Sequence, residues 1–171
     1  VFSTIQIDNV DSDSELLLDS DQIKAAIVLA GRDPNGIAMA ISAVYRQNSY
    51  RAIVRDIKVE NGNLIVKVQE IKIDKIAVVP PKDSRIKEEE IADWINYCGF
   101  GKLAPGSPLN IKEIETSTNQ ASQKIGTFTP LGWRIIQNKK GEVVVVIDVD
   151  EAGTRYVRFG GTTDIDSGDW Q

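Results

Sequence analysis

The chain has 171 residues, 42% of them hydrophobic and 26% charged, proportions typical of a globular protein with room for one domain or two small ones. Its formal net charge of −5 argues against a nucleic-acid partner, which would need a clustered Lys/Arg surface. The sequence has no His and one Cys, which excludes Ser-His and Cys-His nucleophile pairs and the usual structural zinc sites. We therefore expect no enzyme activity, no catalytic residue, no metal site and no cofactor.

The first part of the chain shows the pattern of a strand, two helices and a β-hairpin. Apolar residues spaced among polar ones in FSTIQIDNV, residues 2–10, indicate a strand, and Ser20 is placed to cap the first helix. The apolar stripes of the two helices are Ile23, Ala26, Ile27 and Ala30, then Ile37, Ala40, Ile41, Val44 and Tyr45. Asn61-Gly62 then separates two runs of alternating apolar residues, at about 51–60 and 63–69, which is a strong hairpin signal.

The second part of the chain repeats this order. A strand carries Ile73, Ile76 and Val78. A helix is predicted near 86–97, and Asn110 with Glu113 forms a capping box that opens another helix. The apolar stripe of that helix is Ile111, Ile114, Ala121 and Ile125. FTPLGWRIIQ and GEVVVVIDVDE follow as two strands, joined by a turn at Asn138 to Gly141.

The two parts match at a nearly fixed distance along the chain. Their turn glycines, Gly62 and Gly141, are 79 positions apart, and Glu70 and Glu151, which close the two hairpins, are 81 apart. A new strand-like run follows each of these glutamates. We therefore predict an α+β fold of two tandem β-α-α-β-β domains. The predicted boundaries are 1–70 and 71–151, with 152–171 starting a further element.

This repeat resembles the POTRA (polypeptide-transport-associated) domain family, which has the same element order. The first unit carries AISAVYRQNSYRAIVRDIKVENGNLIVKVQE and then IDKIAVV. The family pattern that it resembles is a helix ending in Tyr, a turn before an aromatic residue and Ala, an extended strand, an Asn/Asp-Gly turn and a strand ending in Glu. The second carries GSPLNIKEIETSTNQASQ, similar to the family's G-x-P-L-x helix start, and KKGEVVVVIDVDE, similar to its closing strand. Ser49 and Val79-Pro80 stand where the family usually has Gly. The resemblance implies that each domain is a three-stranded mixed sheet with two helices on one face.

The resemblance also implies a place and a function. POTRA domains of this kind stand in the periplasm before an outer-membrane β-barrel of the BamA-like superfamily, and a tandem pair is most similar to the transporter of two-partner secretion. We therefore expect a region at the periplasmic face of the outer membrane of a Gram-negative or related envelope. Its partners would be an unfolded secreted polypeptide client and the chain's own β-barrel beyond Gln171.

Several alternatives stay open at this point. Residues 152–171 would start either the first barrel strand or a third POTRA domain. The alternatives to a transporter are an outer-membrane protein assembly factor and a barrel-less periplasmic or cell-division interaction protein. None of these interpretations involves a nucleic acid or a small-molecule substrate.

The family resemblance further implies how a client binds. An outer strand of such a sheet has unpaired backbone N–H and C=O groups, to which an extended client can add as a further strand. The expected edges are the strands at about 51–60 and about 132–137. The predicted client-binding residues are Arg51, Ile53, Arg55, Ile57 and Val59, which would share one face, and Trp133 and Ile135, with Trp133 half-exposed.

Two further expectations concern the first of these edges. Its basic residues, Arg51, Arg55 and Lys58, would discourage pairing between two copies of the edge. The alternative interpretation is that the apolar residues Ile53, Ile57 and Val59 belong to the core and that the basic residues form a solvated rim.

Overall fold

The computed structural model describes residues 2–11, 15–79, 93, 103–124, 131–149, 155–159 and 162–164. These residues form two compact units, Val1–Ile71 and Lys72–Gln171. The predicted α+β class is confirmed, since each unit combines helix with a mixed sheet. Among the described residues, no helix is long and apolar enough to span a membrane.

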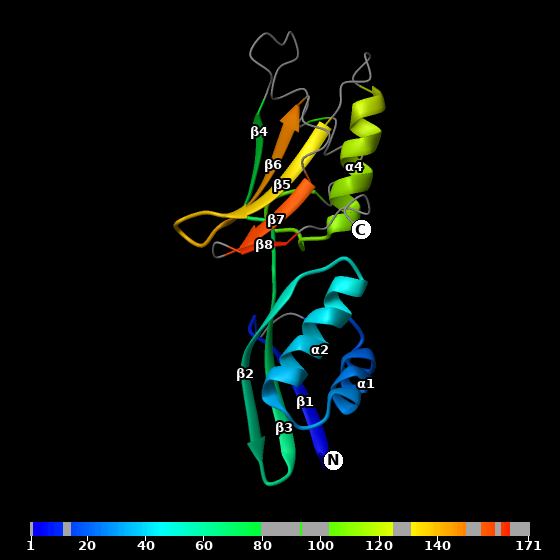
Figure 1. Cartoon of the computed structure of the whole chain (residues 1–171), viewed down its shortest axis with the longest axis vertical. Coiled ribbons are helices and arrows are strands. Elements are labelled where there is room, and N and C mark those ends of the chain that lie inside the picture. The colour runs from blue at the N-terminus through cyan, green and yellow to red at the C-terminus, as the bar shows by residue number, and fades with distance from the viewer. Residues whose placement is uncertain are drawn as a thin grey trace. The chain divides into compact units, whose positions relative to one another are not determined.

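The first unit has the predicted element order of strand, two helices and hairpin. Its elements are β1 (Thr4–Asn9), α1 (Ser20–Ala30), α2 (Pro34–Gln47), β2 (Ala52–Glu60) and β3 (Asn63–Glu70). The sheet has the order β1-β3-β2, with β1 parallel and β2 antiparallel to the central β3. This order makes β1 and β2 the two edges of the described sheet. Both helices cover the same face of the sheet (Figure 1).

Local side chains set where the two helices begin. The Asp19 carboxylate accepts a hydrogen bond from the Asp21 N–H at 3.1 Å, so Asp19 caps α1 and the expected cap, Ser20, is the first helical residue. Asp33 caps α2 in the same way and accepts from the Gly36 N–H at 3.3 Å. Pro34 follows Asp33 at the start of α2, where its missing N–H is harmless.

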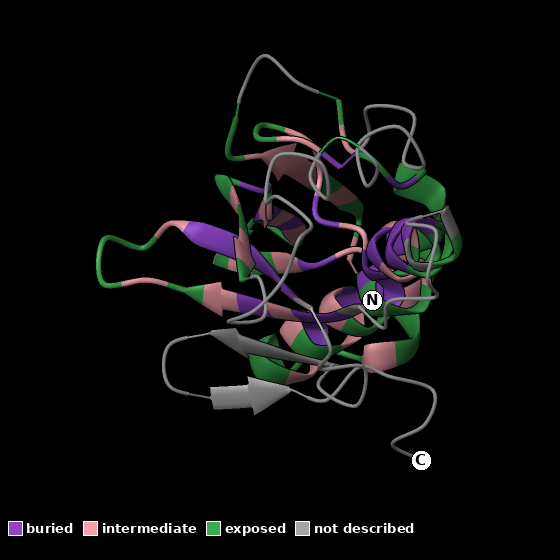
Figure 2. Ribbon diagram, turned by 90° about the horizontal axis from the view of Figure 1, so that it is seen from above, coloured by how far each residue is buried: buried purple, intermediate pink, exposed green. Residues whose placement is uncertain are grey.

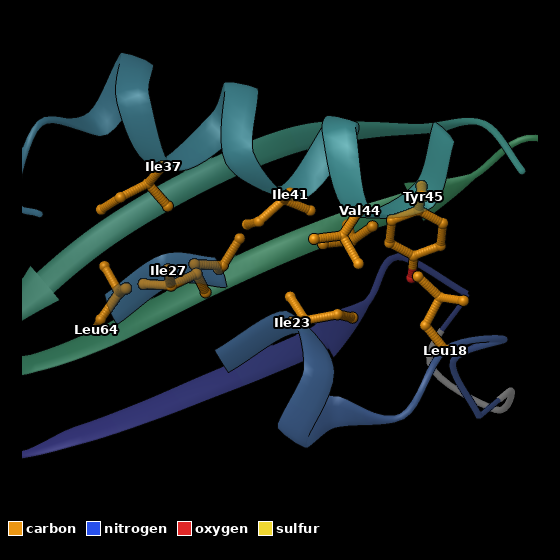
Figure 3. Packing of buried hydrophobic residues seen from close by; sticks show 10 residues of the cluster. Leu18, Ile23, Ile27, Ile37, Ile41, Val44, Tyr45 and Leu64 are labelled. Carbon is orange, nitrogen blue, oxygen red and sulfur yellow. The ribbon is translucent and has the colours of Figure 1, made fainter. Parts of the chain in front are cut away.

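Apolar residues at helical spacing meet the inward face of β3 to form the core of the first unit (Figure 3). The fully buried members are Ile23, Ile27, Ile37, Ile41, Tyr45, Leu64, Val66 and Val68. Each such side chain contributes about 1.5–3 kcal/mol by leaving water. The predicted helix stripes are thereby confirmed at these positions.

The β2–β3 turn has the geometry that Asn-Gly favours. Asn61 has φ 53° and Gly62 has φ 80°, the two positive values of a type I′ turn. The Gly62 C=O also accepts from the Ser3 N–H at 2.8 Å, which ties the turn to the start of β1.

The second unit has a larger sheet than the three strands that we predicted. Its described elements are β4 (Lys75–Val79), α4 (Ile111–Lys124), β5 (Leu131–Gln137), β6 (Val143–Val149), β7 (Arg155–Phe159) and β8 (Thr162–Asp164). The strand order is β4-β6-β5-β7-β8 (Figure 1). The part β4-β6-β5 has the topology of the first sheet, because β4 is parallel and β5 antiparallel to the central β6. Residues 143–148 of β6 are buried and Gly141 in the preceding turn is exposed. Figure 2 shows the ribbon coloured by burial along the described residues.

The described helix of the second unit begins as predicted. The Asn110 side chain accepts from the Glu113 N–H at 3.1 Å and caps α4. Ile111, Ile114 and Ala121 are buried on one face of α4. The predicted helix near 86–97, apart from Asp93, and the last stripe residue, Ile125, lie outside the described residues.

Candidate functional site: a groove beside the β2 edge

Among the residues that the structure describes, strand β2 pairs only with β3, so one row of its backbone groups faces away from the sheet. The direction of each group follows from the alternation of antiparallel pairs. The Ile71 N–H donates to the Arg51 C=O at 3.0 Å, so the backbone groups of Arg51 point toward β3. By alternation, the backbone N–H and C=O groups of Ala52 and Val54 point away from β3. Counting from the type I′ turn shows that those of Ile57 and Val59 point away from β3 as well.

A β-bulge interrupts this edge. Val54 aligns with Val68 and Asp56 with Lys67, so Arg55 is the extra residue. Because the bulge shifts the alternation by one position, the prediction that Arg51, Ile53, Arg55, Ile57 and Val59 share one face is wrong.

The bulge also divides the predicted edge residues between core and solvent. Ile57 aligns with the buried Val66 and packs against the core, together with Val54. Ile53 lies on the opposite face and is 40% exposed, and Val59 is 57% exposed near the turn. The core interpretation therefore fits Ile57, whereas Ile53 and Val59 present apolar surface to solvent.

A groove of about 480 Å³ lies between helix α2 and the segment of β2 that precedes the bulge. The helix contributes Ala38, Met39, Ser42, Ala43 and Arg46, and the strand contributes Ala52, Ile53 and Val54. Small side chains on α2 leave room beside the strand, while Met39 is 73% exposed at the rim. Met is flexible and adapts to apolar partners of different shape. The groove therefore adjoins the outward backbone groups of Ala52 and Val54.

The corresponding strand of the second unit, β5, is not an edge. It pairs with β6 on one side and, in parallel, with β7 on the other. The expectation of a half-exposed Trp133 is wrong, because Trp133 and Ile135 are both fully buried. Within the described residues, β8 forms the outer edge on this side of the second sheet.

Two solved structures share this architecture. CdiB from Escherichia coli matches with a TM-score of 0.58 at 19% identity, over 86% of this chain and 26% of that chain. POTRA1-3 of the periplasmic domain of Omp85 from Anabaena matches with a TM-score of 0.60 at 14% identity, over 87% of this chain and 65% of that chain. The chain has the fold of tandem POTRA domains. No family profile and no curated protein sequence matches it.

A buried polar cluster stabilises the first POTRA domain at the C-terminal end of β3. The Glu70 carboxylate accepts from the Tyr45 hydroxyl at 2.8 Å, from the Leu17 N–H at 2.7 Å and from the Asn9 side chain at 3.4 Å. Burial, and then the Glu70 carboxylate, raise the pKa of Tyr45 well above its ordinary value. Glu70, the last residue of the first hairpin, thus joins α2, β1 and the loop before α1.

Arg51 belongs to this buried end of the domain rather than to the solvent-exposed edge. It is 8% exposed and donates from Nη1 to the Tyr50 C=O at 2.9 Å. Arg55 and Lys58 are exposed, in agreement with a basic outer edge. The expected role of Arg51 in discouraging edge pairing is therefore wrong.

The helical side of the groove was missed by reasoning from the sequence. The stretch GIAMAISA holds a Met among small residues beside the buried stripe of α2. That pattern was a usable signal, since Met39 lies outside the stripe of Ile37 and Ile41. Among the described residues, no group of His, Cys, Asp and Glu is arranged to hold a metal ion.

Proposed function

We propose that this chain is the periplasmic, client-binding region of an outer-membrane polypeptide transporter. In this proposal the first POTRA domain captures an unfolded secreted polypeptide by strand addition and hands it to a β-barrel. The POTRA fold and its likeness to a region of CdiB support the transporter context. The observation that carries the binding role is the open β2 edge beside an apolar groove.

Binding would combine backbone and side-chain contacts. An incoming extended segment would bond to the outward N–H and C=O groups of Ala52 and Val54. Because its side chains alternate, every second one would enter the groove over Ala38 and Ala43. Backbone bonding gives affinity for many sequences, and the groove favours apolar side chains. This mode suits a receptor for unfolded clients and requires no catalysis.

The bulge restricts the segment that can add. A regular strand matches outward groups at every second residue, but Arg55 breaks that spacing between Val54 and Ile57. We therefore place the client on Ala52–Val54, where α2 provides side-chain contacts. The part from Ile57 to Val59, which includes the charged Lys58, would have no client strand paired to it.

Proline substitution tests this register directly. Ala52→Pro removes an outward N–H at the first residue of β2, a position where Pro is tolerated. Binding of a short labelled peptide of alternating valine and threonine should weaken at least about tenfold, the loss expected for one backbone hydrogen bond and the fit around it. Fluorescence anisotropy measures the affinity, and circular dichroism checks the fold.

Val59→Pro is the matched control for the register. It also removes an outward N–H, but beyond the bulge and away from the groove. Peptide affinity should stay within about twofold of the unmodified chain. Equal loss in both variants would contradict the Ala52–Val54 register, and equal retention in both would sink strand addition at β2.

A second pair of substitutions tests the groove. Met39→Glu places a charge at its rim, whereas Leu29→Glu places one on α1, where Leu29 is 89% exposed and lines no part of the groove. Both replace an exposed apolar side chain, so both should fold normally. We expect only Met39→Glu to weaken peptide binding, and similar effects from the two would contradict a role for the groove.

The client class has a close alternative. The likeness to the periplasmic domain of Omp85 equally supports an outer-membrane protein assembly factor. A photo-crosslinking residue at Ile53, used in cells, would separate the two by the mass of the captured client. A secreted protein as the main product supports the transporter, and outer-membrane proteins support the assembly factor.

Membrane fractionation and intact mass of the native product test the remaining alternative. A polypeptide much larger than 18.8 kDa in the outer membrane, with heat-modifiable mobility, is the expected result. A product of about this mass, free in the periplasm or held by one helix, would favour a barrel-less interaction protein instead.

A further inference from the structure

The β5 edge of the second POTRA domain is filled by the chain itself. Strand β7 runs parallel to β5 and pairs with it at four positions, from Trp133↔Arg155 to Ile136↔Arg158. This is the side of β5 that corresponds to the open side of β2 in the first domain (Figure 1). A segment of extended polypeptide thus lies where strand addition would put a client.

The backbone of β5 offers the same outward groups as that of β2. The Asn138 N–H donates to the Glu142 C=O at 2.9 Å, which makes this a bonded pair beside the turn. Alternation from that pair directs the N–H and C=O of Trp133 and Ile135 away from β6 and toward β7. In a parallel ladder Ile135, aligned with Val157, bonds with the residues on either side of Val157.

We propose that the β5 edge is a second strand-acceptor site, which takes extended polypeptide in the parallel orientation and is held closed by β7 until a client strand displaces it. The acceptor role rests on the proposed function, whereas the occupancy by β7 rests on the pairing alone. The two POTRA domains would then offer their acceptor edges in sequence, one open from the start and one opened by exchange.

The structure holds β5 in the sheet independently of β7. Strand β5 pairs with β6 at seven positions, against four with β7. Arg134 also binds Asp148 of β6 through two hydrogen bonds, of 2.5 Å from Nε and 3.0 Å from Nη2. In the described part of the chain, strand β7 is covered on its far side only by the three residues of β8. Departure of β7 would therefore leave the β5–β6 hairpin in place.

A peptide exchange experiment tests the acceptor role. Tyr156→Pro removes an N–H that faces β5, so it should release β7, and Thr163→Pro changes only the outer strand β8. All variants also carry Ala52→Pro, so that the β2 edge does not bind. The probe is a labelled peptide of residues 154–160, TRYVRFG. It should bind the Tyr156→Pro chain at least about tenfold more tightly than the Thr163→Pro chain or the third variant, which carries Ala52→Pro alone.

Competition decides whether the site accepts foreign strands. The valine–threonine peptide should displace the labelled TRYVRFG peptide from the Tyr156→Pro chain. Failure to displace it would mean a specific internal joint and would overturn the acceptor role. Equal binding of TRYVRFG to all three variants, or no binding to a folded Tyr156→Pro chain, would overturn it as well.

A disulfide lock keeps the test valid if Tyr156→Pro unfolds the domain. Ile136→Cys and Arg158→Cys are register partners in neighbouring strands, which lie about 4.8 Å apart and within reach of a disulfide. With Cys98→Ser, only this pair can oxidise. The bond should form, and the oxidised chain should bind the valine–threonine peptide at least about tenfold more weakly than the reduced chain.

The outcomes separate this proposal from the proposed function. No crosslink between the designed cysteines, or binding that ignores oxidation, overturns the closed β5 edge while leaving the β2 results untouched. Absence of peptide binding at β2 together with normal exchange at β5 would overturn only the strand addition at β2 in the proposed function.

Discussion

The hairpin edges of the two POTRA domains have the same topology and opposite states. Strand β2 is open and bulged and has charged Arg55 and Lys58 along its exposed side. Strand β5 is regular, carries the buried Trp133 and Ile135, and is closed by β7. An exposed row of backbone groups attracts any extended chain, so a sheet either makes its edge irregular and charged or covers it. The first domain has the irregular, charged edge, and the second has the covered one.

The difference shows two ways in which a sheet limits the part of an edge that is open to pairing. On β2 the bulge and the charges follow the groove segment, which leaves a short stretch fit for pairing. On β5 every outward group from Trp133 to Ile135 has a partner strand. The comparison can be tested by changing residues whose burial or pairing differs between the domains.

The largest expected effect comes from Trp133→Ala. Trp133 lies on the covered strand β5 and is fully buried, so truncation should destabilise the second domain by about 3–5 kcal/mol. Truncation of an apolar residue on the open edge, Ile53→Ala, should cost less than about 1 kcal/mol, because Ile53 is 40% exposed. Urea unfolding of both variants measures the difference, and similar losses would contradict the contrast in burial.

Hydrogen exchange tests the pairing without any substitution. The amides of Trp133 and Ile135 face β7, whereas those of Ala52 and Val54 face solvent or the groove. We expect the β5 amides to exchange at least about a hundredfold more slowly, equivalent to about 2.7 kcal/mol of opening free energy. Equal exchange rates, followed by NMR, would show that β7 does not protect β5.

The Tyr45–Glu70 bond gives the first domain an alkaline limit. The folded-state pKa of Tyr45 is raised, first by burial, so the protonated phenol is favoured in the folded domain. Its contribution is therefore fully present below the ordinary tyrosine pKa of about 10 and is lost as pH rises above it. Tyr45→Phe should cost about 1–2 kcal/mol at neutral pH, since Glu70 loses a donor.

The same substitution should flatten the fall in stability at high pH. Thermal unfolding of the two chains between about pH 8 and about pH 11 provides the measurement. A parallel decline in both chains would mean that another group sets the alkaline limit.

The smallest contrast concerns the two hairpin turns. Gly62 and Gly141 have φ of 80° and 83°, so alanine at either should cost about 1 kcal/mol through backbone strain. A Cβ at Gly62 would also meet the Ser3 Oγ at 3.3 Å, while at Gly141 the nearest atom is 3.9 Å away. Gly62→Ala should therefore be the more destabilising in thermal unfolding, and the reverse order would contradict the tie between this turn and β1.

Much of the architecture was predictable because it depends on local patterns. Helical spacing at Ile37, Ile41, Val44 and Tyr45 placed the buried face of α2, and Asn61-Gly62 placed the first hairpin. The bulge was also within reach, since Ala52 and Val54 are followed by Ile57 and Val59 with two charged residues between them. A gap of three in a period of two is the signal of an inserted residue.

The element order, the repeat and the hairpins follow from the sequence by itself, because side-chain periodicity acts within a strand or helix. Only the tertiary structure decided which strand covers which edge. Backbone N–H and C=O groups are the same in every residue, so no pattern in RYVRF marks its partner as β5. The groove likewise exists only where α2 packs beside β2, since one wall comes from the helix and the other from the strand that follows it.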